Sequence, residues 1–155
     1  MLMRYARVEP LTDHYGFALD PQPYLEALAG LAEDLPPGAR EWAADPAHYD
    51  FSSVRCVKDL TVGRIGLVDE GPRLVVEIDL RPNEWKHDEG LLLRYSDVRN
   101  LRVDTDEGDG TEPRLGSLQL DEALPHPAGV AHEIAFTNGS VLVVAADLTA
   151  RWHQV

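Results

Sequence analysis

Hydrophobic and polar positions alternate most clearly near the end of the chain, where residues 130–148 read VAHEIAFTNGSVLVVAADL. Alternation with a period of two is typical of a β-strand with one buried face. The Asn138-Gly139 pair between the two apolar runs is a frequent two-residue hairpin turn. It predicts a register that places His132 opposite Ala145, with positive φ at both turn positions.

The same alternation occurs upstream at 73–81, RLVVEIDLR, where aliphatic and charged residues take turns. The glycines at 63 and 66 indicate a bulge or bend in the run before it. We therefore expect six or seven antiparallel strands. The segments that can supply them are 60–68, 73–81, 90–96, 98–104 and 114–121, the hairpin, and the tail LTARWHQV, which can add a short final strand.

A helix is predicted near the start of the chain, with Asp20 as its N-cap and Pro21 at its first position. Leucines then follow at spacings of three and four residues up to Leu35, which gives one apolar stripe. Pro36 and the residues after it end this helix. The segment 39–45 can add one or two further turns.

These elements predict one α+β domain over residues 1–155, with a curled antiparallel sheet of six or seven strands and an N-terminal helix packed on one face. Residues 1–50 form the helical N-terminal segment, and residues 51–155 form the sheet. The run at 141–146 is apolar on both sides, so each face of the sheet needs a cover. The helix can supply one cover, and either the curl of the sheet or a partner must supply the other.

The composition favours a cytoplasmic protein. Its 155 residues include one cysteine, Cys56, which cannot form an intramolecular disulfide. The N-terminus MLMRYARVEPL lacks the apolar run of a signal peptide, and the longest apolar run, VLVVAA, is far too short to span a membrane.

Charge narrows the choice of partners. The chain holds 27 acidic and 14 basic residues, a net charge of −13. Counted over 1–50, 51–100 and 101–155, the net charges are −6, −1 and −6, so the acidity belongs to the two ends. Such a field repels nucleic acid and acidic membranes and attracts a basic protein. Solubility alone is the simpler explanation of the same charge.

His132 and Glu133 are the polar residues of the C-terminal hairpin, but they point to opposite faces of the strand and cannot form a dyad. His132 lies on the more apolar face, diagonal to Asp147 in the predicted register. A histidine held by an acceptor is the simplest account of this position, so we expect a structural role.

The segment 104–112, DTDEGDGTE, is the most acidic part of the chain. It fails as a calcium loop, because glycine and the final glutamate do not fall at the positions that an EF-hand requires. It is predicted to be a solvated loop or a docking surface for a basic partner. As a protein-binding site its members are Asp104, Asp106, Glu107, Asp109 and Glu112.

No other motif indicates chemistry. KHDE at 86–89 and HPAGVAH at 126–132 collect possible metal ligands without a spacing tied to a coordination geometry. Neither G-x-S-x-G nor a glycine-rich phosphate loop occurs. Cys56 lies between Arg55 and Lys58, which could lower a thiol pKa, but a buried inert cysteine is the favoured interpretation. We expect no catalytic residues, no metal and no cofactor.

The segments LLLRYSDVRNLRV, LQLDEALPH and HEIAFTNGSVLVVAADLTARW resemble small bacterial α+β proteins, some of which accompany polymorphic toxins as immunity proteins. The resemblance covers about residues 51–152 and implies a binding protein without chemistry of its own.

The expected function is therefore a non-enzymatic cytosolic binding or inhibitory protein. An immunity protein that neutralises a basic toxin domain through its acidic surface fits this description, because complementary charge speeds association. The alternatives are a small ligand-binding protein or enzyme with a pocket between helix and sheet, and a homodimeric structural subunit.

Overall fold

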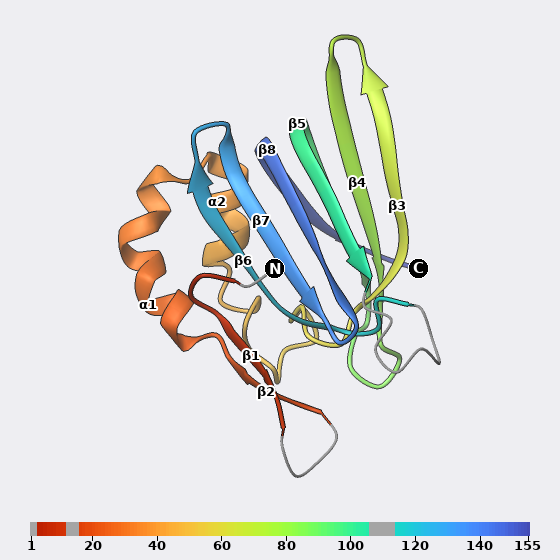
Figure 1. Cartoon of the computed structure of the whole chain (residues 1–155). Helices are drawn as coiled ribbons and strands as arrows, with labels where there is room; N and C mark the ends of the chain where they lie inside the picture. Colours follow the sequence, from red (N-terminus) through yellow and green to blue (C-terminus); the bar gives the residue numbers. More distant parts are fainter. Residues whose placement is uncertain (1–2, 12–15, 106–113) are drawn as a thin grey trace.

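The computed structural model describes residues 3–11, 16–105 and 114–155. Within them, six strands form one antiparallel sheet in the order β3-β4-β5-β8-β7-β6 (Figure 1). The strands are β3 (Thr61–Glu70), β4 (Arg73–Arg81), β5 (Gly90–Thr105), β6 (Leu118–His126), β7 (Gly129–Phe136) and β8 (Gly139–His153). The predicted antiparallel sheet is confirmed. The sheet does not close into a barrel, so β3 and β6 are its edges.

The N-terminal fifty residues contain two short strands that were not predicted, in addition to helices. β1 (Arg7–Pro10) and β2 (Phe17–Asp20) pair as a separate two-stranded sheet. Each is four residues long, which is too short for alternation to reveal it.

The helices follow β2. Helix α1 (Gln22–Leu31) begins one residue later than predicted, with Pro21 rather than Asp20 at its N-cap. The Asp20 carboxylate accepts the Gln22 backbone N–H at 3.0 Å just before the helix. A 3-10 turn, η1 (Ala32–Asp34), and helix α2 (Pro37–Ala44) complete the segment. No helix in the described part of the chain is long and apolar enough to cross a membrane.

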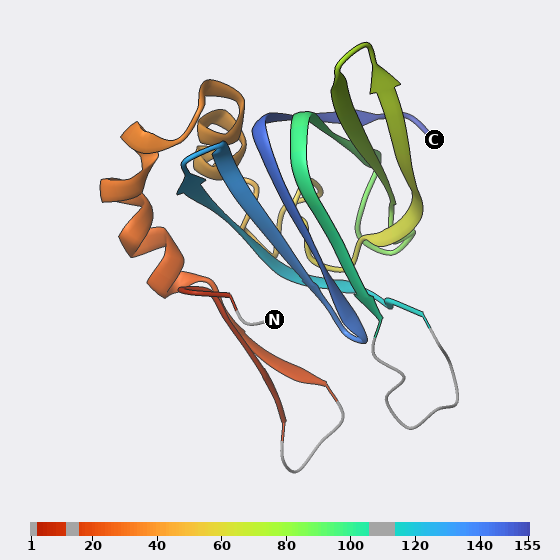
Figure 2. The same cartoon turned by 45° about the horizontal axis from the view of Figure 1, so that its top comes forward.

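Both helices contact the sheet near β6 and β8 (Figures 1 and 2). The hydroxyl of Tyr24 in α1 donates to the Ala123 carbonyl of β6 at 2.7 Å. At the start of α2, the Asp147 carboxylate of β8 accepts the N–H groups of Gly38 and Ala39 at 3.0 and 2.9 Å. A Cβ at Gly38 would lie 2.0 Å from the Leu148 carbonyl oxygen, so only glycine permits this approach. Packing of the N-terminal helix on one particular face of the sheet stays a prediction.

In two places, a pair of short strands predicted from the sequence forms one long strand in the structure. The segments 90–96 and 98–104 are joined in β5, where Asp97 has a φ of +50° and bends the strand without ending it. The tail adds no separate strand, because residues 149–153 continue β8 and pair with the start of β5. The predicted irregularity near Gly63 is confirmed as a bulge between Val62 and Arg64.

The β7–β8 hairpin forms with a register different from the predicted one. Its two turn residues are Thr137 and Asn138, Gly139 already belongs to β8, and neither Asn138 nor Gly139 has a positive φ. His132 therefore lies opposite Val143 rather than Ala145. Because the shift is two residues, every side chain keeps the face that the sequence predicted.

The two edges of the sheet approach each other at one end, where β3 begins and β6 begins. The residues just before β3 meet the start of β6: the Asp59 N–H donates to the Leu118 carbonyl at 2.9 Å, and the Leu118 N–H donates to the Leu60 carbonyl at 2.8 Å. A single bridge between Thr61 and Ser117 extends this contact. Beyond it β3 diverges from β6.

The far end of β3 and β4 leaves the sheet as a two-stranded ribbon (Figure 1). β4 pairs with β5 only as far as Val76, whereas β3 and β4 stay paired up to Glu70 and Arg73. The ribbon ends in a turn at Gly71-Pro72, where Gly71 has a φ of +64°. Leu67 and Val68 on this ribbon are exposed.

Candidate functional site

A buried polar network centred on Asp121 of β6 joins three parts of the fold. One carboxylate oxygen, Oδ1, lies 2.6 Å from His48 Nε2, in the segment after α2. The other, Oδ2, lies 2.6 Å from His132 Nε2 in β7 and 3.3 Å from the indole Nε1 of Trp42 in α2. The backbone carbonyl of Asp121 accepts the Tyr49 hydroxyl at 2.8 Å.

The two imidazoles of the network are each hydrogen-bonded through both ring nitrogens. His48 Nδ1 lies 2.8 Å from the Trp42 carbonyl, which can only accept, and His48 Nε2 faces the Asp121 carboxylate. Both nitrogens must donate, so His48 is an imidazolium. His132 Nδ1 lies 2.6 Å from the Tyr95 hydroxyl, and its Nε2 faces Asp121. The Tyr95 hydroxyl and His132 Nδ1 share one hydrogen bond, and His132 Nε2 donates to the Asp121 carboxylate.

This arrangement keeps Asp121 ionised. Burial alone would raise the pKa of Asp121, but the charge of His48 and the hydrogen bonds from His132 and His48 outweigh burial and hold the pKa well below its usual value. Burial, together with the negative charge of Asp121, raises the pKa of Tyr95 and of Tyr49. The network is thus a buried carboxylate surrounded by hydrogen-bond donors from His48, His132 and Trp42.

Asp121 and its partners are closed off from solvent. Asp121 and His48 are each 1% exposed, and His132 and Tyr95 are 0% exposed. The His48 ring also stacks on Tyr49 and lies tilted against Trp42, with both centroids 3.9 Å from its own. A side chain that acts on a substrate has to be accessible to it, and these side chains are buried. Their hydrogen bonds hold α2 and the segment after it against the sheet.

A pair of buried acids lies close to this network, where β6 pairs with β7. Glu122 and Glu133 are directly opposite each other in the register. The Glu122 carboxylate accepts three successive backbone N–H groups, from Arg4, Tyr5 (3.0 Å) and Ala6 (2.9 Å), and so holds the N-terminal segment against the sheet. Burial and the neighbouring charge of Glu122 raise the pKa of Glu133. This pair is also structural, and its unfavourable interaction falls on Glu133.

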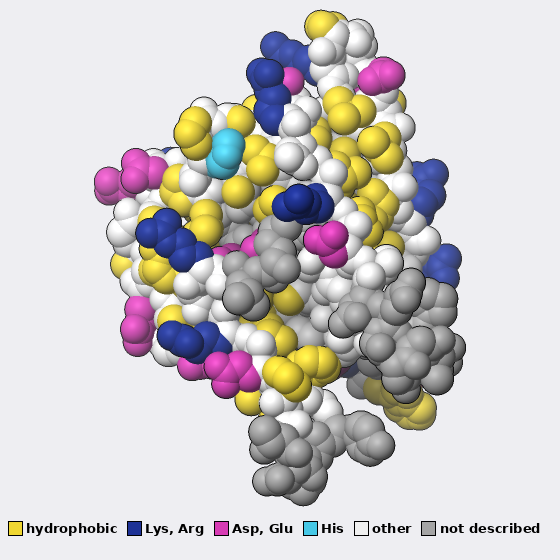
Figure 3. All heavy atoms as spheres, viewed as in Figure 1, with side chains coloured by type: hydrophobic (Ala, Val, Ile, Leu, Met, Phe, Trp, Pro, Cys, Tyr) yellow, Lys and Arg dark blue, Asp and Glu magenta, His cyan; other side chains and the backbone are white. Residues whose placement is uncertain are grey.

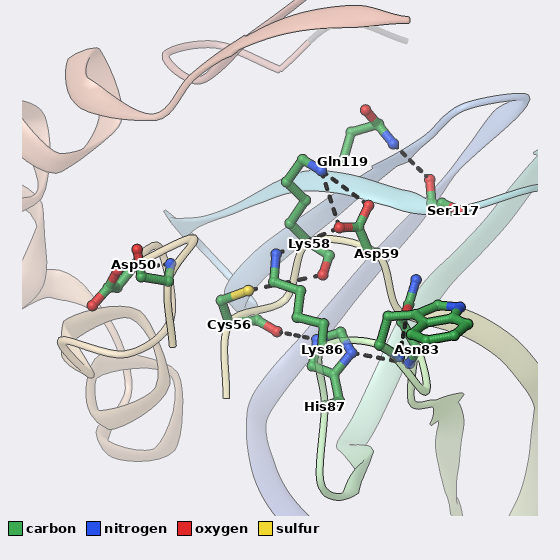
Figure 4. A network of polar contacts seen from close by, with 11 residues as sticks. Asp50, Cys56, Lys58, Asp59, Asn83, Lys86, His87, Ser117 and Gln119 are labelled. Atoms are coloured by element: carbon green, nitrogen blue, oxygen red, sulfur yellow. Dashed lines mark hydrogen bonds and ion pairs between the residues drawn. The ribbon is translucent and has the colours of Figure 1, made fainter. Parts of the chain in front are cut away.

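The clearest surface feature lies where two loops are joined, residues 45–60 and residues 82–89. His87 is buried at this junction: its Nε2 donates to the Cys56 carbonyl at 2.9 Å, and its Nδ1 accepts the Asn83 N–H at 3.0 Å (Figure 4). These bonds require the neutral ring, and burial lowers the pKa of His87 in agreement. The loop 82–87 therefore has a fixed conformation.

Both lysines of the chain converge on one acid at this junction. Lys58 Nζ lies 3.0 Å from both carboxylate oxygens of Asp59, and Lys86 Nζ lies 3.4 Å from one of them (Figure 4). On the same two loops, Arg55 pairs with Glu89 at 2.8 Å. The bases of the two loops are thus paired internally.

Trp85 stands out from this fixed loop with 90% of its surface exposed. Phe51 and Val54 on the facing loop are exposed too, and Lys86, next in sequence to Trp85, lies 5.9 Å from the Phe51 ring. We call the exposed residues of these two loops, the apolar Phe51, Val54 and Trp85 and the acids Asp50, Glu84 and Asp88, the Trp85 surface. Glu84 and Asp88 form no hydrogen bond or ion pair within the described residues.

The acidic loop predicted as a protein-binding site falls mostly outside the described residues. Asp104 is exposed at the end of β5. Asp106, Glu107, Asp109 and Glu112 lie outside the described ranges. Among the described residues, no group of three or more histidines, cysteines or carboxylates is arranged to hold a metal ion.

His132 and Glu133 point to opposite faces, as predicted, and each meets a different acid of β6. The expected acceptor of His132 is wrong, because Asp147 caps α2 and Asp121 takes its place. Cys56 is buried, as favoured, although it lies in a loop rather than in a strand.

Sequence reasoning missed Asp121, His48 and Trp85. The acids of LQLDEAL interrupt an apolar run, which is the one signal that could have marked Asp121 as a buried charge. No pattern in the sequence pairs it with His48, which is 73 positions away.

No family model, curated protein or solved structure matches this chain. The function is therefore argued from the side chains described above.

Proposed function

We propose that this chain is a non-enzymatic binding protein of the bacterial cytoplasm that inhibits a basic protein partner, in the manner of an immunity protein that neutralises a toxin domain. The exposed Trp85 on its fixed loop carries the proposal. The remaining support comes from where the reactive side chains lie and from the distribution of charge.

The groups best suited to catalysis are occupied inside the molecule. His48, His132 and Asp121 satisfy one another in the core, and His87 and Cys56 are buried at the loop junction. General acid–base or nucleophilic catalysis needs such groups within reach of a substrate. Their burial favours a binding role over an enzymatic one.

The Trp85 surface has the composition of a binding hot spot. Tryptophan is enriched among residues that dominate interface energies, and such residues work best when they are held in place before binding. The bonds from His87 to Cys56 and Asn83 hold the loop, while the indole itself remains exposed. Association would bury the indole without first ordering the loop.

Charge around this surface favours a basic partner. Lys58 and Lys86 share one acid, Asp59, and Arg55 pairs with Glu89, so these two loops keep a single unbalanced positive charge among the paired residues. The acids of the Trp85 surface are exposed, and the whole chain carries −13. A basic protein with an apolar pocket would meet complementary charge around a tryptophan anchor.

The test is binding and inhibition of a basic toxin domain encoded next to this chain's gene. Trp85→Ala should weaken binding by about thirtyfold or more, the loss expected for a hot-spot aromatic, and should abolish protection in a co-expression growth assay. Val103→Ala is the matched control, because Val103 is exposed on β5 away from the Trp85 surface. Equal protection by Trp85→Ala and the wild type would contradict the proposal.

A second candidate is ligand binding, which one cavity favours. A groove of about 700 Å³ lies between β1 and the β7–β8 hairpin, with Arg7, Glu9, Phe136 and Ser140 among its lining residues. It lies between the N-terminal hairpin and the sheet, whereas the sequence-based alternative placed a pocket between helix and sheet. Ser140→Trp should fill the groove and abolish small-molecule binding, while leaving inhibition of the toxin domain intact.

A further inference from the structure

The outer edge of β3 carries a second inference, independent of the Trp85 surface. Beyond the bridge at Thr61, no described residue pairs with this edge, since β3 is the terminal strand of the sheet. Proteins usually protect such edges with proline, lysine or a bulge, because unpaired backbone groups recruit another strand. The segment Arg64–Glu70 contains no proline or lysine, and the bulge lies before it.

The hairpin turn determines which backbone groups are free. The two-residue turn at Gly71-Pro72 closes the pair Glu70–Arg73, so this pair exchanges backbone hydrogen bonds. In an antiparallel ladder such pairs alternate along the strand. The N–H and C=O groups of Ile65, Leu67 and Asp69 therefore point away from β4, towards the open edge.

An exposed apolar side chain lies at the centre of this free segment. Leu67 is 59% exposed, although it is paired with Val76, which is fully buried. Leu67 and Ile65 share the face of the ribbon that carries Val76 and Ile78, the face that continues into the core. Hydrophobic side chains are visible at the molecular surface over β3 and β4 (Figure 3).

The charged side chains of β3 would be complementary to those of a second, antiparallel β3 strand. Arg64 lies three residues before Leu67 and Glu70 three residues after it. In an antiparallel pair with a twofold axis at Leu67, Arg64 of each copy lies opposite Glu70 of the other. This is a pair without backbone hydrogen bonds, in which side chains come closest. The Arg64 guanidinium already lies along the strand, because its carbon would be 3.9 Å from a Cβ at Gly66.

We propose that the occupant of this edge is a second copy of the chain, paired antiparallel through β3 about a twofold axis at Leu67. The hydrogen-bonded pairs are Leu67 with Leu67 and Ile65 with Asp69 of the second copy, which uses the free backbone groups in matching positions. The two sheets become one twelve-stranded sheet, and the exposed Leu67 side chains meet. An isologous pair closes on itself and leaves no free β3 edge for further addition.

The first experiment measures the mass of the full chain by light scattering after size exclusion, over low to high micromolar concentrations. The wild type should approach twice its 17.2 kDa. Leu67→Lys, which sets two ammonium groups face to face at the axis, should remain a monomer throughout. Val103→Lys is the matched control, because it adds the same charge at an exposed valine on β5, and it should dimerise as the wild type does. Circular dichroism checks that each variant is folded.

The second experiment uses the twofold symmetry. Arg64→Glu alone creates two acid–acid pairs, and Glu70→Arg alone creates two base–base pairs, so each should weaken dimerisation roughly tenfold or more. Mixed together, the two variants restore both opposite-charge pairs and should form a heterodimer with an affinity near that of the wild type. The Arg94–Glu70 pair within one chain is lost in Glu70→Arg whether or not the partner is present, so it does not affect the recovery.

Three results would overturn the proposal: a wild type that stays at 17.2 kDa at high micromolar concentration, a dimer that survives Leu67→Lys, or a mixture that fails to recover. If the amides of β3 became protected from hydrogen exchange only when a foreign protein was added, the occupant would be that protein and not a second copy. None of these outcomes depends on Trp85, so they test dimerisation independently of the proposed inhibitory function.

Discussion

At one end of the sheet, β6 and β7 carry four buried ionisable side chains, Asp121, Glu122, His132 and Glu133. At the other end, β3 carries Arg64, Asp69 and Glu70 on an exposed strand that has a free edge. The first group connects the sheet to α2 and to the N-terminal segment. The second makes few contacts within the chain.

The buried charged residues stabilise the fold, whereas the exposed charged residues of β3 are available for association with another protein. A buried charge is costly unless every lone pair and proton finds a partner, so the Asp121 network tolerates one arrangement only. Exposed charges cost little in any arrangement and contribute little to folding. We therefore expect mutations at the β6–β7 end to change stability, and mutations on the β3–β4 ribbon to change association.

The largest effect should come from removing the charge at the centre of the buried network. Asp121→Asn leaves the His48 imidazolium without its counterion and should lower the free energy of unfolding by about 3–5 kcal/mol. Urea denaturation followed by circular dichroism measures this change. Tyr95→Phe is the milder variant, because it removes only the hydrogen bond to His132, and it should cost about 1–2 kcal/mol.

Asp104→Asn is the matched control, since it makes the same substitution at an exposed strand end and should change stability by less than about 0.5 kcal/mol. If Asp121→Asn and Asp104→Asn proved equally mild, the two ends of the sheet would not differ as argued.

The same network predicts how stability depends on pH. The folded protein holds the pKa of Asp121 below the ordinary value of 3.8, so the unfolded chain binds the extra proton first. The stabilisation from Asp121 is therefore complete above pH 3.8 and is lost as the pH falls from there towards the folded pKa. Acid titrations of the wild type and Tyr95→Phe should both show this loss, and Asp121→Asn should lack it.

Much of the fold could be predicted from the sequence, because period-two alternation and turn residues are local signals. β4, the bulge in β3 and a helix that starts near Asp20 were found in this way. The β7–β8 register was wrong because Asn-Gly is also compatible with a turn one residue earlier, and the pairing of Gly139 with Phe136 decides between them. The long strands β5 and β8 were divided because a bend at Asp97 looks like a strand end in sequence.

The buried network could be predicted only in part. The structural role of His132 followed from its apolar neighbours on one face, but its acceptor did not, because β6 and β7 pair with a register shift near Leu118 that alternation does not reveal. His48 comes from an irregular segment after α2. Its position depends on tertiary packing against Trp42 and Tyr49, which no local pattern records.

A smaller effect of opposite sign is expected at the paired glutamates. Burial and the charge of Glu122 raise the pKa of Glu133 above 4.5, so the folded state holds its proton more tightly than the unfolded chain does. Stability is therefore lost as the pH rises through 4.5 towards the folded pKa. Glu133→Gln should raise the free energy of unfolding at pH 7 by roughly 0.2–1 kcal/mol, the scale of cross-strand side-chain interactions, because it removes a like-charge pair.

The gain from Glu133→Gln should disappear below pH 4.5, where the wild-type side chain is itself neutral. Parallel urea denaturations at neutral and acidic pH measure both values. A gain of the same size at both pH values would show that it does not come from the charge on Glu133.

The smallest effect should come from the ribbon. Arg94 and Glu70 form an ion pair at 2.6 Å, but their side chains are 43% and 51% exposed, so water and salt screen the attraction. Glu70→Gln should change the unfolding free energy of dilute protein by less than about 0.5 kcal/mol, even though the pair is as short as the buried contacts of Asp121. Denaturation must be measured at a concentration where the chain is monomeric, because any dimer would add its own concentration-dependent stability. Under that condition, Glu70→Gln tests whether a short ion-pair distance by itself implies a large contribution to stability. A loss as large as that of Tyr95→Phe would mean that the ribbon is held by its charges and that the two ends of the sheet follow the same rule.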